Sequence, residues 1–280
     1  MTNLSDLKLD KWEAPGEPEP GRTGIRIAIV LVILAALAAG GYYWLGRRTQ
    51  PEPAGVRAHT EQPVAGTPTP KPVAEAGDII DLPPLPQTDA IVRQLVSGLS
   101  THPAAAAWLA GDQLLRGFAV SVHNIAAGRS PSAQLIRLRP AQKFAVRGTG
   151  SDLSIDPRSY ARYDAYADAV AALDARGAAR LYATLKPRIQ DAHRELGDPD
   201  GDFDRVMARA IDELLATPVL EGKVALASKS VSYEFADARL QSLSSAQRQL
   251  LRMGPRNVKM IQAKLREIAP LIGVSVTRQP

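Results

Sequence analysis

The sequence contains no cysteine, which excludes a disulfide framework, a thiolate zinc site and a cysteine nucleophile. Aromatic residues are also scarce, at 5% of the 280 residues, whereas alanine is abundant. Glycine and proline number 21 and 22, so turns should be frequent. This composition favours helices packed through small side chains over a β-sandwich rich in tyrosine and valine.

A strong excess of charge of one sign is absent as well. The 34 basic and 29 acidic residues leave a net charge of +5, and the basic residues are spread along the chain instead of forming a tail. This balance does not identify a nucleic-acid-binding protein. The length allows one sizeable core with appendages, because single domains usually contain about 100 to 200 residues.

Motifs of the common enzyme and nucleotide-binding classes are missing. The sequence holds no GxSxG, GxxxxGK(S/T), HExxH or CxxC pattern, and Gly148-Thr149-Gly150 lacks the third glycine of a dinucleotide loop. The acidic run at 198–204 fails as a calcium loop, because the positions that need glycine and glutamate hold Phe203 and Arg209. We therefore predict neither a metal nor a cofactor.

One long hydrophobic run is present, from Ile27 to Leu45, without a charge or a proline. Its roughly 19 residues would form a helix about 29 Å long, close to the thickness of about 30 Å of a bilayer core. Arginines flank the run, and aromatic residues at 42–44 match those usual at membrane interfaces. The sequence therefore predicts a transmembrane helix over residues 25–46 and a single-pass membrane protein.

A cleaved signal peptide is the alternative, since Ala36-Leu37-Ala38 has the small-x-small pattern of a peptidase site. Basic residues are equally frequent near the two ends of the run, so the positive-inside rule does not fix the orientation. The short polar tail before the run favours a cytoplasmic N-terminus and a periplasmic domain. Ala36 and Gly40 form a small-xxx-small pair, which keeps a homo-oligomer open.

Proline-rich sequence on both sides of this run predicts disorder. Residues 1–24 are expected to form a disordered tail, and residues 47–87 a disordered linker. In the linker, proline is mixed with Ala, Thr, Gly and Glu, a composition that buries too little apolar surface to offset the entropy of ordering. A mainly helical soluble domain is predicted at 88–273, followed by a tail at 274–280.

Apolar residues at helical spacing predict most of the elements of this domain. Helix starts are also expected at Ser130-Pro131 and Asp156-Pro157, where a capping side chain precedes a proline. The expected helices cover residues 91–99, 114–125, 164–173, 177–196 with a kink at Pro187, 203–216, 245–253 and 255–269. Residues 143–147 and 223–235 are expected to pair as a small sheet. The predicted fold class is thus mainly α, with one transmembrane helix and a small β-hairpin or sheet.

The densest chemistry lies at residues 160–168. Tyr160, Tyr163 and Tyr166 recur every three residues, and Asp164 and Asp168 share one helix face. Such a surface would offer phenols and a carboxylate pair to a ligand or partner, and paired carboxylates also serve in glycoside hydrolysis. The alternative is structural, with packed tyrosines whose hydroxyls reach the surface and with solvated aspartates. The structural interpretation is favoured.

Two C-terminal helices separated by Gly254 form the second candidate. The basic residues that lie largely off the apolar face are Arg252, Arg256, Lys259 and Arg266. A short turn with glycine between two helices is typical of a DNA-binding helix-turn-helix, but ordinary helical hairpins share the pattern. DNA binding would also need a cytoplasmic domain. A structural pair with a basic surface for an anionic partner is therefore favoured.

Several stretches resemble a known family. They are Leu82-Pro83-Pro84-Leu85, His102-Pro103 with Trp108-Leu109, Asp156-Pro157-Arg158-Ser159-Tyr160 with Arg162-Tyr163-Asp164, and residues 250–267. These stretches are similar to the proteobacterial domain-of-unknown-function family numbered 3014, over about residues 82–268. The family has no assigned activity, cofactor or catalytic residue, so the resemblance transfers no site. It implies a bacterial envelope protein, and the predicted span then places this chain in the bacterial inner membrane as a single-pass protein.

These observations favour a membrane-tethered, non-enzymatic interaction module of the bacterial cell envelope. The expected partner is a protein or an envelope polymer, and nucleic acid is disfavoured. The alternatives are an envelope hydrolase that uses Asp164 and Asp168 and a membrane-anchored DNA-binding protein. Enzymatic activity therefore stays open, with a non-enzymatic role preferred.

Overall fold

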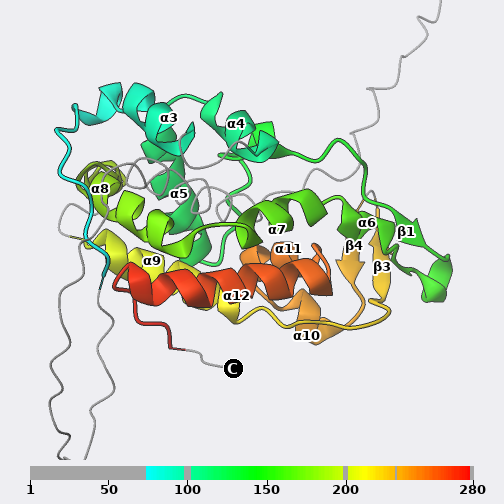
Figure 1. Cartoon of the computed structure of the whole chain (residues 1–280). Helices are drawn as coiled ribbons and strands as arrows, with labels where there is room; N and C mark the ends of the chain where they lie inside the picture. The colour runs from blue at the N-terminus through cyan, green and yellow to red at the C-terminus, as the bar shows by residue number, and fades with distance from the viewer. Residues whose placement is uncertain (1–73, 98–101, 198–200, 231, 278–280) are drawn as a thin grey trace, which may run out of the picture.

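Four long helices pack along their apolar faces to form the centre of the molecule. The computed structural model describes residues 74–97, 102–197, 201–230 and 232–277. The long helices are α5 (Leu114–Ala126), α8 (Ala175–Arg194), α9 (Phe203–Leu215) and α12 (Pro255–Leu271). Helix α5 packs against α8 and α9, while α12 packs against α8, α9 and the shorter α7 (Asp164–Ala171) (Figure 1).

Helix α9 shows how the sequence produces this packing. The Asp202 carboxylate caps its N-terminus by accepting a hydrogen bond of 3.0 Å from the backbone N–H of Asp204. Its buried residues recur at spacings of three and four and are Phe203, Val206, Met207, Ala210, Ile211, Leu214 and Leu215. The Phe203 ring lies 5.8 Å from that of Phe118 on α5. Each large side chain buried in this way contributes about 1.5 to 3 kcal/mol to stability.

Shorter helices surround this core and connect the long ones. They are α3 (Asp89–Ser97), α4 (Pro103–Leu109), α6 (Arg158–Ala161), α10 (Ala238–Gln241) and α11 (Ser245–Leu251), with the 3-10 turns η2 (Leu85–Gln87), η3 (Ile136–Leu138) and η4 (Gly150–Asp152). Helix α11 begins with a capping box, in which Ser244 and Gln247 exchange side-chain hydrogen bonds with each other's backbone N–H. A tight turn through Gly254 then leads into α12.

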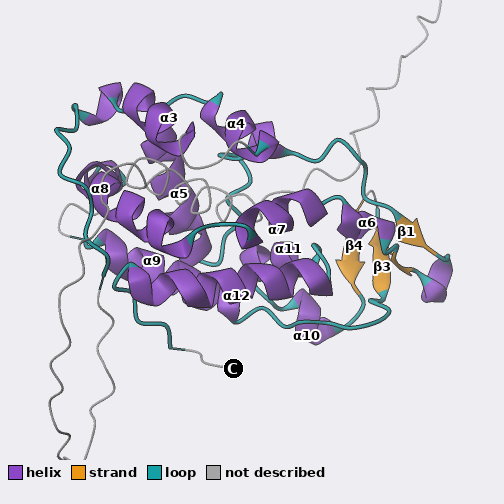
Figure 2. Ribbon diagram, in the orientation of Figure 1, coloured by secondary structure: helices purple, strands orange, loops and turns teal. Residues whose placement is uncertain are grey.

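Two small antiparallel sheets lie at one end of the molecule (Figure 2). Strand β1 (Val146–Arg147) pairs with β2 (Ser154–Ile155), and β3 (Leu226–Lys229) pairs with β4 (Ser232–Phe235). A single bridge between Ser154 and Ala225 joins the two sheets. The two segments expected to pair with each other therefore pair mainly with closer neighbours, 143–147 with β2 and 223–235 within itself. A separate apolar cluster lies beneath them, formed by Leu153, Ile155, Val224, Leu226, Phe235 and Leu251.

The predicted fold class needs a correction. Among the residues that the structure describes, no helix is both long enough and apolar enough to cross a bilayer. Even α8, with 20 residues, carries charged side chains along its outer side. The transmembrane helix, the membrane-protein assignment and the inner-membrane placement therefore find no support in the structure, and the predicted fold class is corrected to a mainly helical domain with two small antiparallel sheets. Residues 25–46, to which the span was assigned, lie outside the described residues.

The end of the predicted linker is ordered against the domain. The Glu75 N–H donates to the carbonyl of Leu271, and the side chains of Leu82 and Leu85 are buried in the helical core. These two apolar side chains anchor the segment to the core, although the proline-rich composition had predicted disorder there. The expected tail at 1–24 and the first part of the linker lie outside the described residues.

One further expectation about helices failed for a local reason. No helix begins at Ser130-Pro131, because the backbone N–H of Ser130 donates to the Ser245 hydroxyl and the Ser130 side chain bonds to Gln249 on α11. The capping group is thus committed to a distant helix. The helix expected at 177–196 is confirmed as α8, which runs through Pro187 to Arg194, and the kink at Pro187 stays a prediction. The short helices α4 and α10 were not predicted.

Candidate functional site

The two predicted surfaces meet in the structure and neutralise each other. Helix α7 packs against α12, so that Asp164 and Asp168 face Arg256. The Arg256 Nη2 donates to Asp168 Oδ1 at 2.6 Å, and its Nη1 lies 3.7 Å from Asp164 Oδ1. We call this junction the α7–α12 seam. Because each carboxylate has a cationic neighbour, the pair does not form an open acid and base site.

Asn257 at the start of α12 is the centre of the seam, and sequence reasoning missed it. Its side chain is buried, with 1% of the residue exposed. The amide Nδ2 lies 2.9 Å from Asp164 Oδ1, 2.9 Å from the Met253 carbonyl oxygen and 3.2 Å from that of Tyr160, and these three acceptors share its two protons. One amide thereby fixes α7, the turn before α12 and the end of α6 relative to one another.

A close backbone approach completes the seam. Gly254 has a φ of +86°, which favours glycine, and a Cβ atom built there would lie 2.5 Å from Tyr160 Cγ. The Tyr160 ring therefore packs directly on the turn between α11 and α12. This contact explains why the glycine separates the two helices, and it is the packing of an ordinary helical hairpin.

The three predicted tyrosines do not share one exposed surface. Tyr163 is buried with 1% exposed, whereas Tyr160 and Tyr166 are half-buried and pack against two different apolar clusters. Burial raises the pKa of the Tyr163 phenol to about 12. These side chains are chiefly part of the core.

The four predicted basic residues also do not form one basic surface, because they contact different partners. The Arg252 guanidinium lies 5.3 Å from the centre of the Phe235 ring and donates to the Tyr233 carbonyl. Lys259 pairs with Glu221 at 2.5 Å, and Arg256 belongs to the seam. Burial lowers the pKa of Arg252. The buried Nε of Arg266 has no hydrogen-bond partner among the described residues.

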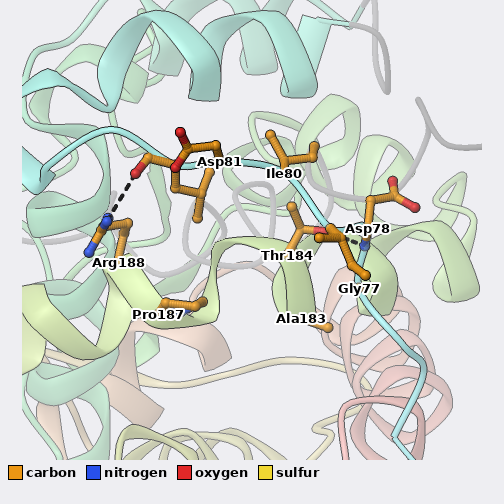
Figure 3. Close-up of a pocket in the computed structure, with 10 residues that line it drawn as sticks. Gly77, Asp78, Ile80, Asp81, Ala183, Thr184, Pro187 and Arg188 are labelled. Carbon is orange, nitrogen blue, oxygen red and sulfur yellow. Dashed lines mark hydrogen bonds between the residues drawn. The ribbon is translucent and has the colours of Figure 1, made fainter.

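A groove of about 420 Å³ lies where residues 77–82 cross α8. Figure 3 shows the residues that line it. The Asp78 N–H donates to the Thr184 hydroxyl at 2.8 Å, and Arg188 donates to the carbonyls of Leu82 and Pro83. Gly77 touches the α8 backbone so closely that a Cβ would lie 2.4 Å from Thr184 N. These contacts fasten the segment to the helix, so the groove is mainly a packing junction.

A second cavity, of about 320 Å³, lies between α6 and the segment that leads into β1. We call it the Arg162 pocket, and its lining consists of Gln142, Lys143, Ala145, Arg158, Ala161 and Arg162. Arg162 directly follows α6, and only 8% of it is exposed. Its Nε donates to the Ser159 carbonyl at 2.9 Å and its Nη1 to the Gln142 carbonyl at 3.1 Å. The guanidinium is thus held in one position by two backbone oxygens.

The charge of Arg162 is left uncompensated within the described part of the chain. Its buried Nη2 has no hydrogen-bond partner there, and no described carboxylate forms an ion pair with it. Its neighbours are aromatic, with the guanidinium carbon 5.5 Å from the centre of the Phe144 ring and 5.1 Å from that of Tyr163. Burial lowers the pKa of Arg162, but an arginine stays charged at neutral pH.

The other cations of the pocket differ in what they contact. Arg158 is committed to Asp156, with its Nη2 at 2.6 Å and its Nε at 3.0 Å from Asp156 Oδ2. Lys143 is exposed and has no ion-pair partner among the residues described. The sequence did hold a signal for this site, because Arg158 and Arg162 are four residues apart and so share a helix face. The sequence prediction assigned only the neighbouring tyrosines and aspartates and left both arginines out.

The fold and the pocket define a helical domain with a buried, fixed arginine open to a surface cavity. No group of three or more histidine or acidic side chains suited to a metal ion occurs in the described ranges. The chain belongs to the protein family of unknown function DUF3014, whose family model matches residues 114–269, more than half of the sequence. This match confirms the family inferred from the sequence, over a shorter range. No curated protein and no solved structure matches the chain.

Proposed function

We propose that this protein is a non-enzymatic binding module that holds an anionic group of its partner in the Arg162 pocket. The observation that carries the proposal is the lining of the pocket, in which Lys143, Arg158 and the fixed Arg162 guanidinium are cationic and no side chain is acidic. An anion in the pocket would offset part of the cost of holding Arg162, which is only 8% exposed, away from water. The positive charge of the pocket therefore favours binding of an anionic group.

The lining of the pocket supports binding in preference to chemical conversion. Its residues include no carboxylate, no histidine and no hydroxyl side chain, which are the usual general bases and oxygen nucleophiles. Lys143 is exposed at the rim of the pocket. The pocket thus offers recognition of charge and shape.

The two alternative functions receive no support from the geometry. A hydrolase would need Asp164 or Asp168 free to exchange protons, and Arg256 and Asn257 engage both. A DNA-binding surface would need free basic side chains at the start of α12, where Arg256 and Lys259 form ion pairs. We therefore propose neither.

Site-specific photocrosslinking in the native cell tests the proposal. A photoreactive amino acid replaces Lys143 at the rim of the pocket in the full chain, and a matched chain carries it in place of Arg209, an exposed arginine on α9. We expect a defined adduct from position 143 and none from position 209, and we expect Arg162→Met to abolish it. Equal adducts from both positions, or an adduct unaffected by Arg162→Met in folded protein, would contradict the proposal.

A further inference from the structure

We infer that the anionic group held in the Arg162 pocket is a phosphate monoester, carried either by a phosphorylated residue of a protein partner or by a small phosphate ester. This inference rests on the proposed function and names the ligand chemistry of the same site. Three properties of the pocket support it: its surplus of positive charge, the donors that solvent reaches, and its size.

The region of the pocket carries more positive charge than one monovalent anion balances. Lys143, Arg158 and Arg162 line the cavity. Arg147 on β1 lies beside them, because its Nη2 is 4.0 Å from the Asp156 carboxylate that also binds Arg158. Asp156 is the one carboxylate that pairs with any of these four cations in the described ranges, so about three positive charges are left over. A carboxylate ligand would balance one of them, whereas a phosphate group, with about 1.5 to 2 negative charges, balances more.

The donors available to a ligand are exposed side chains. Asp156 Oδ2 binds the Nε and Nη2 atoms of Arg158, at 3.0 Å and 2.6 Å, which leaves the Nη1 atom without a partner in the described part of the chain. The Arg158 side chain is 83% exposed, and Lys143 is exposed as well. A guanidinium held in place by a carboxylate and a nearby ammonium group suit a ligand with three strong acceptor oxygens, which a phosphate group has.

Arg162 contributes its charge and not a hydrogen bond. Its Nε and Nη1 atoms donate to carbonyls, and its Nη2 atom is buried away from the ligand. Because the residue is only 8% exposed, water screens its charge less than that of an exposed arginine. Arg162 therefore raises the attraction for an anion in the cavity, while Arg158 and Lys143 make the contacts.

The size of the cavity limits the ligand to one small group. A volume of about 320 Å³ lies at the lower end of the range for ligand pockets, so a single phosphate group with its ester substituent fits and a polymer segment does not. The lining contains no carboxylate that would repel such a group. A single phosphate ester therefore fits the pocket in both charge and volume.

Calorimetric titration of the purified full chain, at constant ionic strength in a buffer without phosphate, tests this assignment. The probes are methyl phosphate, the blocked phosphoserine peptide Ac-Ala-pSer-Ala-NH2, sodium sulfate and sodium acetate. We expect both phosphate esters to bind and acetate to bind at least about tenfold more weakly. Tighter binding of the peptide than of methyl phosphate would assign the group to a protein partner, and the reverse order would assign it to a small ester.

The pH dependence of binding shows whether the second negative charge matters. A phosphate ester gains that charge with a pKa of about 6, so its affinity should fall at least about fivefold between about pH 7.5 and about pH 5. Sulfate keeps both charges in this range, and its affinity should not change. On the protein, the side-chain hydrogen bond from Arg158 lowers the pKa of Asp156 to about 2, so this carboxylate stays ionised. A constant affinity for methyl phosphate, or an equal loss for sulfate, would overturn the assignment.

Substitutions of exposed side chains link binding to the pocket without disturbing the core. Arg158→Gln should weaken methyl phosphate binding at least about tenfold, while the matched Arg209→Gln on α9 should leave it unchanged. Lys143→Gln should weaken it less, by about threefold, because a flexible lysine holds a ligand less firmly than a fixed guanidinium does. Unchanged affinity in both pocket variants would overturn the assignment.

Failure of this inference is distinguishable from failure of the proposed function. A crosslink from position 143 that depends on Arg162, without binding of either phosphate ester, would overturn the phosphate assignment and leave the proposed function standing. Acetate binding as tight as that of methyl phosphate would have the same consequence. Conversely, binding of methyl phosphate without any crosslink from position 143 would retain the phosphate ester and remove the macromolecular partner.

Discussion

The α7–α12 seam and the Arg162 pocket come from one stretch of sequence, residues 158–168, yet they treat charge in opposite ways. In the seam, Asp164 and Asp168 are engaged by Arg256 and Asn257. In the pocket, the more deeply buried Arg162 has no described counterion. The ion pairs and the Asn257 amide hold α7 to α12, whereas Arg162 has no described carboxylate partner and is part of the proposed binding pocket. Dense chemistry in a sequence therefore identifies a region, and the tertiary structure shows how its charges are paired.

The largest effect is expected where the seam is most tightly packed. Gly254→Ala combines a φ of +86° with a Cβ placed 2.5 Å from the Tyr160 ring, so we expect a loss of about 3 kcal/mol in the free energy of unfolding. The matched control is Gly222→Ala, where φ is +83° and no atom lies within 4 Å of the added Cβ, which should cost about 1 kcal/mol. Urea denaturation compares the two, and equal losses would show that packing on Tyr160 contributes nothing.

Within the seam, loss of the buried amide should reduce the free energy of unfolding more than loss of the exposed ion pair, though less than Gly254→Ala does. Asn257→Leu leaves Asp164 Oδ1 and two backbone carbonyls without their donor, so we expect it to cost about 2 to 3 kcal/mol. Arg256→Met removes a half-exposed ion pair and should cost less than about 1 kcal/mol. Urea denaturation of the two variants measures both losses of free energy. The reverse order would mean that charge, and not the amide, holds α7 to α12.

Removal of the pocket charge should change stability less than either seam substitution that disturbs packing. Arg162→Met eliminates an uncompensated buried charge, which favours folding, but it leaves the Ser159 and Gln142 carbonyls without their donor. These opposing effects are each about 1 to 3 kcal/mol, so the free energy of unfolding should remain within about 1 kcal/mol of that of the parent chain. A loss above about 3 kcal/mol would assign Arg162 to the structure and weaken the contrast with the seam.

The smallest effect concerns acid stability at the rim of the pocket. The side-chain hydrogen bond from Arg158 lowers the pKa of Asp156 to about 2. The unfolded chain binds this proton near a pKa of about 3.9, so the contribution to stability is complete above about pH 4 and is lost as pH falls towards 2. Arg158→Gln should shift acid unfolding, followed by circular dichroism, to slightly higher pH. An unchanged midpoint would show that Asp156 gains nothing from Arg158.

Helices with a clear apolar stripe were predictable from the sequence. The expected helices at 114–125, 203–216 and 255–269 correspond to α5, α9 and α12, because one buried face at helical spacing determines both their existence and their ends. Short elements were harder to predict. Helix α4, with seven residues, has too few positions for a periodic pattern, and the β1–β2 pair consists of two residues per strand.

Sequence patterns did not predict the contacts that depend on distant partners. Ser130 had the sequence of a helix cap, but Ser245 and Gln249 lie against it in space. Asp164 and Asp168 share a helix face as expected, yet α12 brings Arg256 to them from nearly ninety positions along the chain. Local patterns carry no information on which segment of the chain will cover a given face.

The sequence by itself determined the absence of cysteine chemistry, the long amphipathic helices and the family to which the chain belongs. These properties depend on composition and on the spacing of neighbouring residues, which tertiary contacts do not alter. Only the tertiary structure decided that Arg256 and Asn257 bind the two aspartates in the seam. It also decided that Arg162 has no carboxylate partner among the described residues. Compensation of a charge requires another group within a few ångströms, and that distance is set by how the helices pack.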